Sequence, residues 1–89
     1  RFTVATRTGN VKAMIEVGVA VDVDTTEVSE RMAEWSEVDF VWQVSGEEDI
    51  VVVADTTDTG ALNDLITKAR EMDEVVSTKT RLILAEKLG

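Results

Sequence analysis

The side chains best suited to bind a small molecule in this 89-residue chain gather at a tight turn. Asp49 can accept hydrogen bonds from an ammonium group, and Gly46 can adopt a positive φ that leaves backbone N–H groups accessible to a carboxylate. Glu47, with Glu48 beside it, adds negative charge that favours a basic or polar ligand. A structural alternative stays open, because Gly and Asp are common in hairpin turns.

Two threonines form a second candidate. Thr78 and Thr80 are two residues apart, so both hydroxyls lie on the same side of an extended strand. They can hydrogen-bond the head group of an amino acid. Threonine also favours strands because its side chain is β-branched, so strand propensity alone explains the pair equally well.

The composition removes most catalytic chemistry. Histidine and cysteine are both absent, which excludes disulfides, the usual zinc sites, Ser-His-Asp triads and Cys-His pairs. A general base would have to be a carboxylate or a lysine, so we expect no enzymatic activity and no cofactor. Asp22, Asp24 and Glu27 resemble a cation loop only faintly, since the Gly and later Glu of a calcium loop are missing, and a helix cap is favoured.

The charge balance limits the partners. Eighteen acidic and nine basic residues give a formal net charge of −9, and such a surface repels nucleic acid. Sparse lysine and abundant Asp, Glu and Thr suit a salt-rich cytoplasm, so we expect a cytoplasmic, halophilic protein. No apolar run approaches the roughly 20 residues of a membrane span, so no membrane partner is expected.

The first half of the chain predicts a strand and then a helix. Residues 11–21 alternate between apolar and mixed positions, as a strand does. Asp24 or Thr25 can cap the following helix, on which Val28, Met32 and Trp35 form an apolar stripe. The apolar face of this strand consists of Val11, Ala13, Ile15, Val17, Val19 and Val21.

The rest predicts a hairpin, a second helix and a last strand. Residues 38–44 and 49–54 flank a short Gly-containing turn, which is typical of an antiparallel hairpin. A cap-rich stretch over 56–60 precedes the second helix, and residues 75–85 form the last strand. The expected faces are Val38, Phe40, Trp42 and Val44 in the hairpin, Leu62, Leu65, Ile66, Ala69 and Met72 in the helix, and Val76, Thr78, Thr80, Leu82 and Leu84 in the last strand.

This order predicts an α+β, ferredoxin-like βαββαβ fold, in which two helices cover one face of a four-stranded antiparallel sheet. The hairpin strands carry apolar residues on both sides, with Val41 beside Phe40 and Trp42. The helix-free face would therefore leave an apolar patch in water. We expect the chain to dimerise through this open face.

Two motifs resemble the C-terminal ligand-sensing domain, or RAM domain, of the Lrp/AsnC transcriptional regulators. The segment Val44-Ser45-Gly46-Glu47-Glu48-Asp49-Ile50 is similar to the family's Val-Thr-Gly-x-x-Asp turn. The segment Thr78-Lys79-Thr80, before the apolar end of the last strand, is similar to its Thr-x-Thr motif. The similarity extends from about residue 11 to the end.

The resemblance implies a dimer built by sheet packing, commonly in a ring of four dimers, with amino-acid effectors bound between dimers. Carried over by position, the ligand-binding residues are Gly46, Glu47, Asp49, Thr78 and Thr80. It also implies that residues 1–10 are an edge strand or linker from a separate DNA-binding domain, and that residues 11–89 form the ligand-sensing and oligomerisation domain. DNA would be contacted only through that other domain.

The sequence therefore favours an effector-binding domain of an Lrp/AsnC-like regulator. A free-standing version that binds a metabolite, or assembles with full-length regulators, is one alternative. A small ferredoxin-like dimeric enzyme that uses a carboxylate or lysine as its base is another.

Overall fold

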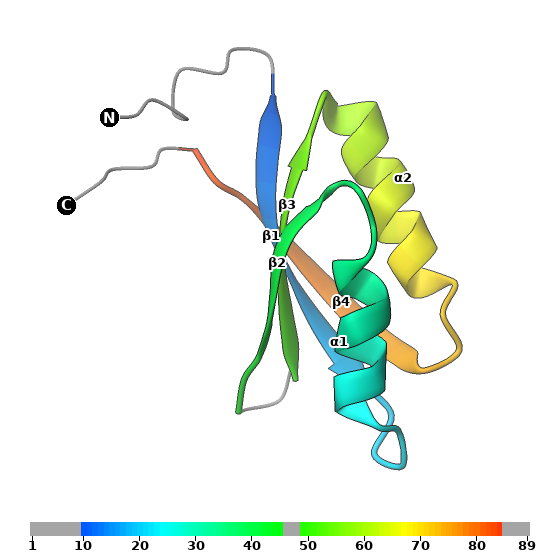
Figure 1. The fold of residues 1–89 in the computed structure, drawn as a ribbon. Coiled ribbons are helices and arrows are strands. Elements are labelled where there is room, and N and C mark those ends of the chain that lie inside the picture. The colour runs from blue at the N-terminus through cyan, green and yellow to red at the C-terminus, as the bar shows by residue number, and fades with distance from the viewer. Residues whose placement is uncertain (1–9, 46–48, 85–89) are drawn as a thin grey trace, which may run out of the picture.

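A computed structural model describes residues 10–45 and 49–84, and over these residues the predicted α+β, ferredoxin-like fold is confirmed. The four strands form one antiparallel sheet in the order β2-β3-β1-β4, and both helices lie on one side of it (Figure 1). The elements are β1 (Val11–Val19), α1 (Thr25–Ala33), β2 (Val38–Gln43), β3 (Ile50–Thr56), α2 (Thr59–Arg70) and β4 (Val75–Leu82).

Aspartate caps begin both helices. The Asp24 carboxylate accepts hydrogen bonds from the backbone N–H groups of Thr26 and Glu27 at 3.0 and 3.4 Å, which confirms its predicted capping role. Asp58 does the same for α2, accepting from the N–H of Ala61 at 2.8 Å. Both caps satisfy N–H groups that have no partner within the helix.

The hydrophobic core lies between the sheet and the two helices. Alternate residues of β1 and β3 point toward the helices, and the predicted apolar faces of both helices pack against them. Each large side chain buried there contributes roughly 1.5–3 kcal/mol. The buried residues are Ala13, Ile15, Val17, Val19, Val28, Met32, Ile50, Val52, Ala54, Leu62, Leu65, Ala69 and Met72. Val21 is an exception to the predicted strand face, because β1 ends at Val19 and Val21 is fully exposed in the following turn.

A register shift corrects the predicted face of β2. Val38 pairs with Ala54 and packs against the core, whereas Phe40 pairs with Val53, so the pairing slips by one residue between Val38 and Phe40. The prediction that Val38 shares a face with Phe40 and Trp42 is therefore wrong. Such a bulge adds one residue to one strand and reverses the side on which the following side chains lie.

A second shift corrects the predicted face of β4. Val75 pairs with Val19 and packs against the core, but the next paired residue of β4 is Ser77, opposite Gly18. Val76 is the additional residue and is 66% exposed. Regular alternation, from which Val76 was predicted to share a face with Thr78, is therefore interrupted at Val76.

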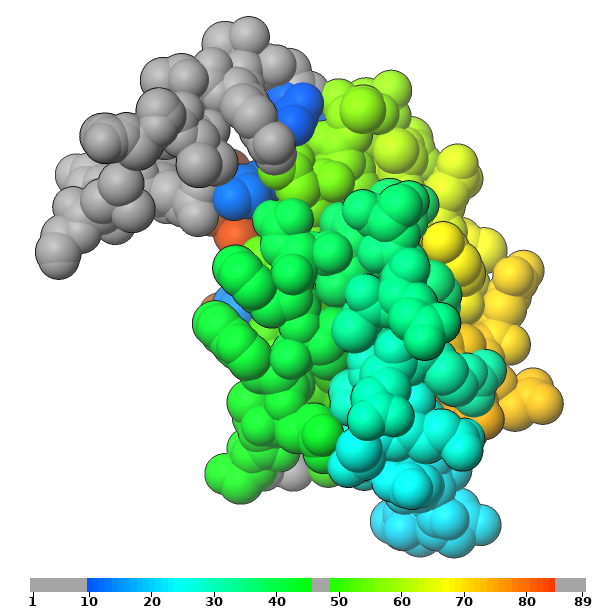
Figure 2. All heavy atoms as spheres, in the orientation of Figure 1, coloured from blue at the N-terminus to red at the C-terminus, as the bar shows by residue number. Residues whose placement is uncertain are grey.

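The face of the sheet away from the helices, here called the helix-free face, has an apolar half and a charged half. Phe40 and Trp42 are 54% and 53% exposed, and their rings stack with centroids 5.9 Å apart. The side chains of β2, green in Figure 2, protrude on the side of the sheet away from the helices. The apolar half comprises Phe40, Trp42, Val51, Val53 and Met14. The predicted apolar patch is thus present.

The charged half of the helix-free face lies on β1 and β4. Arg81 Nε lies 3.3 Å from Glu16 Oε2, and Lys79 is the strand partner of Glu16. Strand alternation places these three side chains on the same side as Met14. This charged half was not predicted from the sequence. No helix in the described part of the chain is long and apolar enough to cross a membrane.

Candidate functional site

Three of the five predicted ligand-binding residues belong to the described structure. Gly46 and Glu47 lie outside the described residues, whereas Asp49, Thr78 and Thr80 are placed. The backbone N–H of Asp49 donates to the carbonyl oxygen of Val17 at 3.0 Å, and Thr78 is the partner of Val17 on β4. One strand, β1, therefore separates Asp49 from the two threonines within a single chain.

Asp49 stabilises the sheet on both of its sides. Its Oδ2 accepts a hydrogen bond from the N–H of Val19 at 3.3 Å, beyond the last paired residues of β1 and β3. Its backbone carbonyl accepts from the N–H of Val44 at 2.9 Å and so connects the two arms of the hairpin. Among the described residues no cation pairs with this carboxylate. Its second oxygen can therefore still accept from a ligand ammonium.

Thr78 and Thr80 share one side of β4, as predicted. Their partners Val17 and Ile15 are core residues, so both hydroxyls lie on the side that carries the helices. Thr80 is exposed, whereas Thr78 is half-buried and its Oγ1 accepts a hydrogen bond from Arg70 Nε at 3.0 Å. A ligand that uses both threonines would have to approach from the helix side of the sheet edge.

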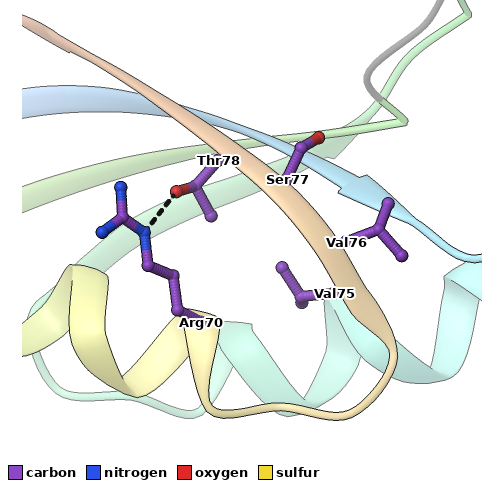
Figure 3. Close-up of a pocket in the computed structure, with 5 residues that line it drawn as sticks. All are labelled: Arg70, Val75, Val76, Ser77 and Thr78. Carbon is purple, nitrogen blue, oxygen red and sulfur yellow. Dashed lines mark hydrogen bonds between the residues drawn. The ribbon is translucent and has the colours of Figure 1, made fainter.

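A cleft of about 330 Å³ opens between the end of α2 and the start of β4. Figure 3 shows the Arg70 guanidinium directed toward the Thr78 hydroxyl, with the Ser77 side chain pointing away from it. The residues that line the cleft are Arg70, Val75, Val76, Ser77 and Thr78. Arg70 was not among the predicted residues, because no local pattern in the sequence shows that the end of α2 lies against Thr78.

Two carboxylates with lowered pKa values each join a loop to a helix. Glu37, in the loop after α1, pairs with Lys68 of α2, and Glu74, in the loop after α2, pairs with Arg31 of α1. A hydrogen bond from its own backbone lowers the pKa of Glu37, and Lys68 Nζ, 3.5 Å away, lowers it further. The pKa of Glu74 is lowered by its own backbone and by Arg31, whose Nη1 lies 2.8 Å from Oε2. A carboxylate tuned as a general base has a raised pKa, so both shifts suit structural ion pairs instead.

Metal ligation finds no support in the described residues. No three His, Cys, Asp or Glu side chains of residues 10–45 and 49–84 are grouped closely enough to hold a metal ion. The binding groups that the described structure offers are the Asp49 carboxylate, the Thr78 and Thr80 hydroxyls and the Arg70 guanidinium. These groups recognise polar and charged organic molecules through hydrogen bonds.

The sequence is similar to one protein family and to segments of two kinds of longer protein. The family described as the Lrp/AsnC ligand binding domain matches residues 12–88. A homocitrate synthase from Sulfurisphaera tokodaii is 36% identical over 75 residues, which are 84% of this chain but 16% of the enzyme. The transcriptional regulator LysM from the same organism is 28% identical over 85 residues, or 94% of this chain and 61% of the regulator. The chain thus spans only part of these relatives.

Solved structures share the fold. FFRP-DM1 superposes with a TM-score of 0.78 and 32% identity, over 83% of this chain and 99% of that chain. A transcriptional regulator from Neisseria meningitidis, solved with L-methionine, gives a TM-score of 0.77 at 22% identity, over 89% of this chain and 53% of that chain. The second match shows the fold alone.

Proposed function

Because this chain belongs to the Lrp/AsnC ligand-binding domain family, we propose that it binds an amino-acid effector and assembles through its sheet. The observation that carries the proposal is the helix-free face, on which Phe40 and Trp42 remain about half exposed in the single chain. Contiguous apolar surface of this kind is typical of protein–protein interfaces. The chain itself would sense and assemble, and would not catalyse a reaction.

Assembly would begin with a dimer in which two sheets pack face to face, about 10 Å apart. A two-fold axis would bring Phe40 and Trp42 of each chain into a shared apolar layer. The Glu16–Arg81 pair borders this layer and would favour one orientation of the two sheets over others. We further propose that these dimers assemble into a closed ring of four dimers.

The effector site would combine residues of different chains. Asp49 and the pair Thr78 and Thr80 lie on either side of β1, so one chain does not gather them around one ligand. We propose that the turn at Gly46, Glu47 and Asp49 binds the ammonium end and that the threonines of a neighbouring chain bind the head group. The acidic turn favours a basic or polar amino acid.

The domain context has three candidates, each favoured by one relative. LysM, of which the chain spans 61%, supports a sensing domain joined to a DNA-binding domain, with residues 1–10 as the linker. FFRP-DM1, of which it covers 99%, supports a free-standing domain. The homocitrate synthase supports a sensing segment attached to an enzyme. In each context we propose a cytoplasmic, salt-rich setting, in keeping with the net charge of −9.

Two measurements on the whole chain test the proposal. Light scattering at micromolar concentration and high salt should give at least the mass of a dimer, and a strict monomer would refute assembly. A thermal-shift screen of the twenty amino acids should raise the melting temperature most with a basic or polar one, because a ligand stabilises the state that it binds. If no amino acid shifts the transition, the sensing part of the proposal fails and assembly alone remains.

A further inference from the structure

Arg70 is the last residue of α2, and its guanidinium lies over the cleft between α2 and β4. Its Nε donates to Thr78 Oγ1 at 3.0 Å, which directs the guanidinium toward β4 (Figure 3). The Nη1 and Nη2 groups form the other edge of the guanidinium, here called the fork, from which two parallel N–H groups can donate. In the described structure they have no hydrogen-bond or ion-pair partner.

Arg70 differs in this respect from the other arginines of the described residues. Arg31 pairs with Glu74 and Arg81 pairs with Glu16, at 2.8 and 3.3 Å. Among residues 10–45 and 49–84 no carboxylate pairs with Arg70, although acidic residues outnumber basic ones by 18 to 9 in the whole sequence. The donors on Nη1 and Nη2 are therefore available to an anion that is not part of the chain.

The position of Arg70 at the end of a helix explains only part of this arrangement. A cation in the last turn is favoured by the helix dipole, and Lys68 meets that condition too. Lys68, however, also pairs with Glu37 and stacks over the ring of Trp35, 4.8 Å from its centroid. The helix dipole therefore explains why a basic residue ends α2. It does not explain why that residue is an arginine whose guanidinium is hydrogen-bonded to Thr78 over a cleft.

Part of the cleft is suited to a short apolar group, beside the polar Ser77 and Thr78. Val75 and Val76 line it, and the register shift at Gly18 leaves Val76 66% exposed. A guanidinium edge fits a carboxylate through two parallel hydrogen bonds. We propose that this cleft binds a small monocarboxylic acid with a short aliphatic tail, with the carboxylate on Arg70 and the tail on the two valines.

This inference shares Thr78 with the proposed effector site but goes beyond the proposed function, because it needs neither the hairpin turn, nor Asp49, nor a second subunit. All five lining residues belong to one chain. The net charge of −9 also argues against general attraction of anions to the surface, so an anion bound here would be bound by local geometry.

Isovalerate and isovaleramide are the test pair, because they have nearly the same shape and only the acid is charged. The ¹⁵N-labelled whole chain is titrated with each at constant, high ionic strength, with chloride replaced by isovalerate. Saturable NMR shifts of the amides of residues 75–78 and of Arg70 Nε are expected with isovalerate, with a Kd on the order of 1 mM. Isovaleramide should bind at least about tenfold more weakly.

Variants distinguish the fork from simple charge. Arg70→Gln should abolish the isovalerate shifts, and Arg70→Lys should weaken them because lysine keeps the charge but loses the fork. Lys68→Gln removes the same charge from the same helical turn and should bind like the native chain. Amides of β3 report in every variant that the fold is retained, as expected for a substitution at the exposed Arg70.

The inference would be overturned by the absence of a saturable shift, by equal binding of acid and amide, or by undiminished binding in the Arg70→Gln variant. Asp49→Asn separates this cleft from the proposed effector site. It should leave isovalerate binding unchanged, whether or not amino acids stabilise the native chain. Loss of isovalerate binding in Asp49→Asn, with the fold intact, would also contradict a site confined to α2 and β4.

Discussion

The side-chain oxygen of Ser77 on β4 lies 2.5 Å from the position that a Cβ atom on Gly18 of β1 would occupy. The two residues are strand partners, and the register shift follows directly after them. Gly18 thus allows the Ser77 hydroxyl to lie against the backbone of β1 at the bulge. The same bulge turns Val75 into the core and exposes Val76, so it shapes the cleft beneath Arg70.

Gly18→Ala should therefore stabilise the chain only when the Ser77 hydroxyl is absent. The added methyl group would force Ser77 out of its rotamer, at a cost of about 1 kcal/mol. In a Ser77→Ala background that conflict is gone, and alanine in a strand should then be about 0.5–1 kcal/mol better than glycine. Denaturant unfolding of the two single variants and the double variant measures the coupling. Additive effects would show that the contact carries no energy.

The strand faces show why alternation predicted most of the sheet but not all of it. Ile15, Val17 and Val52 lie in the core as a period of two requires. Val38 does not follow its predicted face and Val76 is left without a strand partner, because each stands at a register shift. A bulge arises from the pairing of two strands, and the pattern within one strand carries no sign of it.

The candidate site was predictable to the extent that it depends on strand order and local turns. Spacing alone indicated that Thr78 and Thr80 share a side, and the register confirms this. The contact of Arg70 with Thr78 was not predictable, since it depends on how α2 packs against β4. Likewise, the hydrogen bond from Val19 to Asp49 joins residues 30 positions apart.

Two substitutions of Asp49 separate its structural role from its proposed ligand role. Asp49→Ala removes the acceptor for the part-buried N–H of Val19 and should lower the free energy of unfolding by about 1–2 kcal/mol. Asp49→Asn keeps a carbonyl oxygen as acceptor and should cost far less. If the carboxylate binds the effector ammonium, however, Asn should reduce the effector-induced thermal shift. An Asn variant with an undiminished shift would leave Asp49 with a structural role only.

Trp42→Asp tests whether the helix-free face forms the dimer. Because Trp42 is 53% exposed in the single chain, the charge should be tolerated in the monomer but not between two packed sheets. Light scattering should show a fall in mass, while far-UV circular dichroism remains native. Val21→Asp makes a similar apolar-to-acidic change at a fully exposed turn position and is the matched control. A dimer that persists in Trp42→Asp would place the interface elsewhere.

The lowered pKa of Glu37 predicts how stability falls in acid. A carboxylate whose pKa is lower in the folded chain than its ordinary value of 4.5 stabilises the fold fully above that value. This contribution is lost as the pH falls through the lower folded-state pKa, because the unfolded chain then binds the proton more readily. The pair with Lys68 is partly exposed, so its contribution should be below about 1 kcal/mol and smaller at high salt.

Thermal unfolding of the native chain and of Glu37→Gln, from about pH 6 to about pH 3, measures this effect. Both should lose stability in acid, since Glu74 also has a lowered pKa, but the glutamine variant should lose less. Lys68→Gln removes the partner and should reduce the acid sensitivity in part, because the backbone of Glu37 is the larger cause of its shift. Identical pH profiles for the native and Glu37→Gln chains would show that the Glu37 carboxylate does not link protonation to folding.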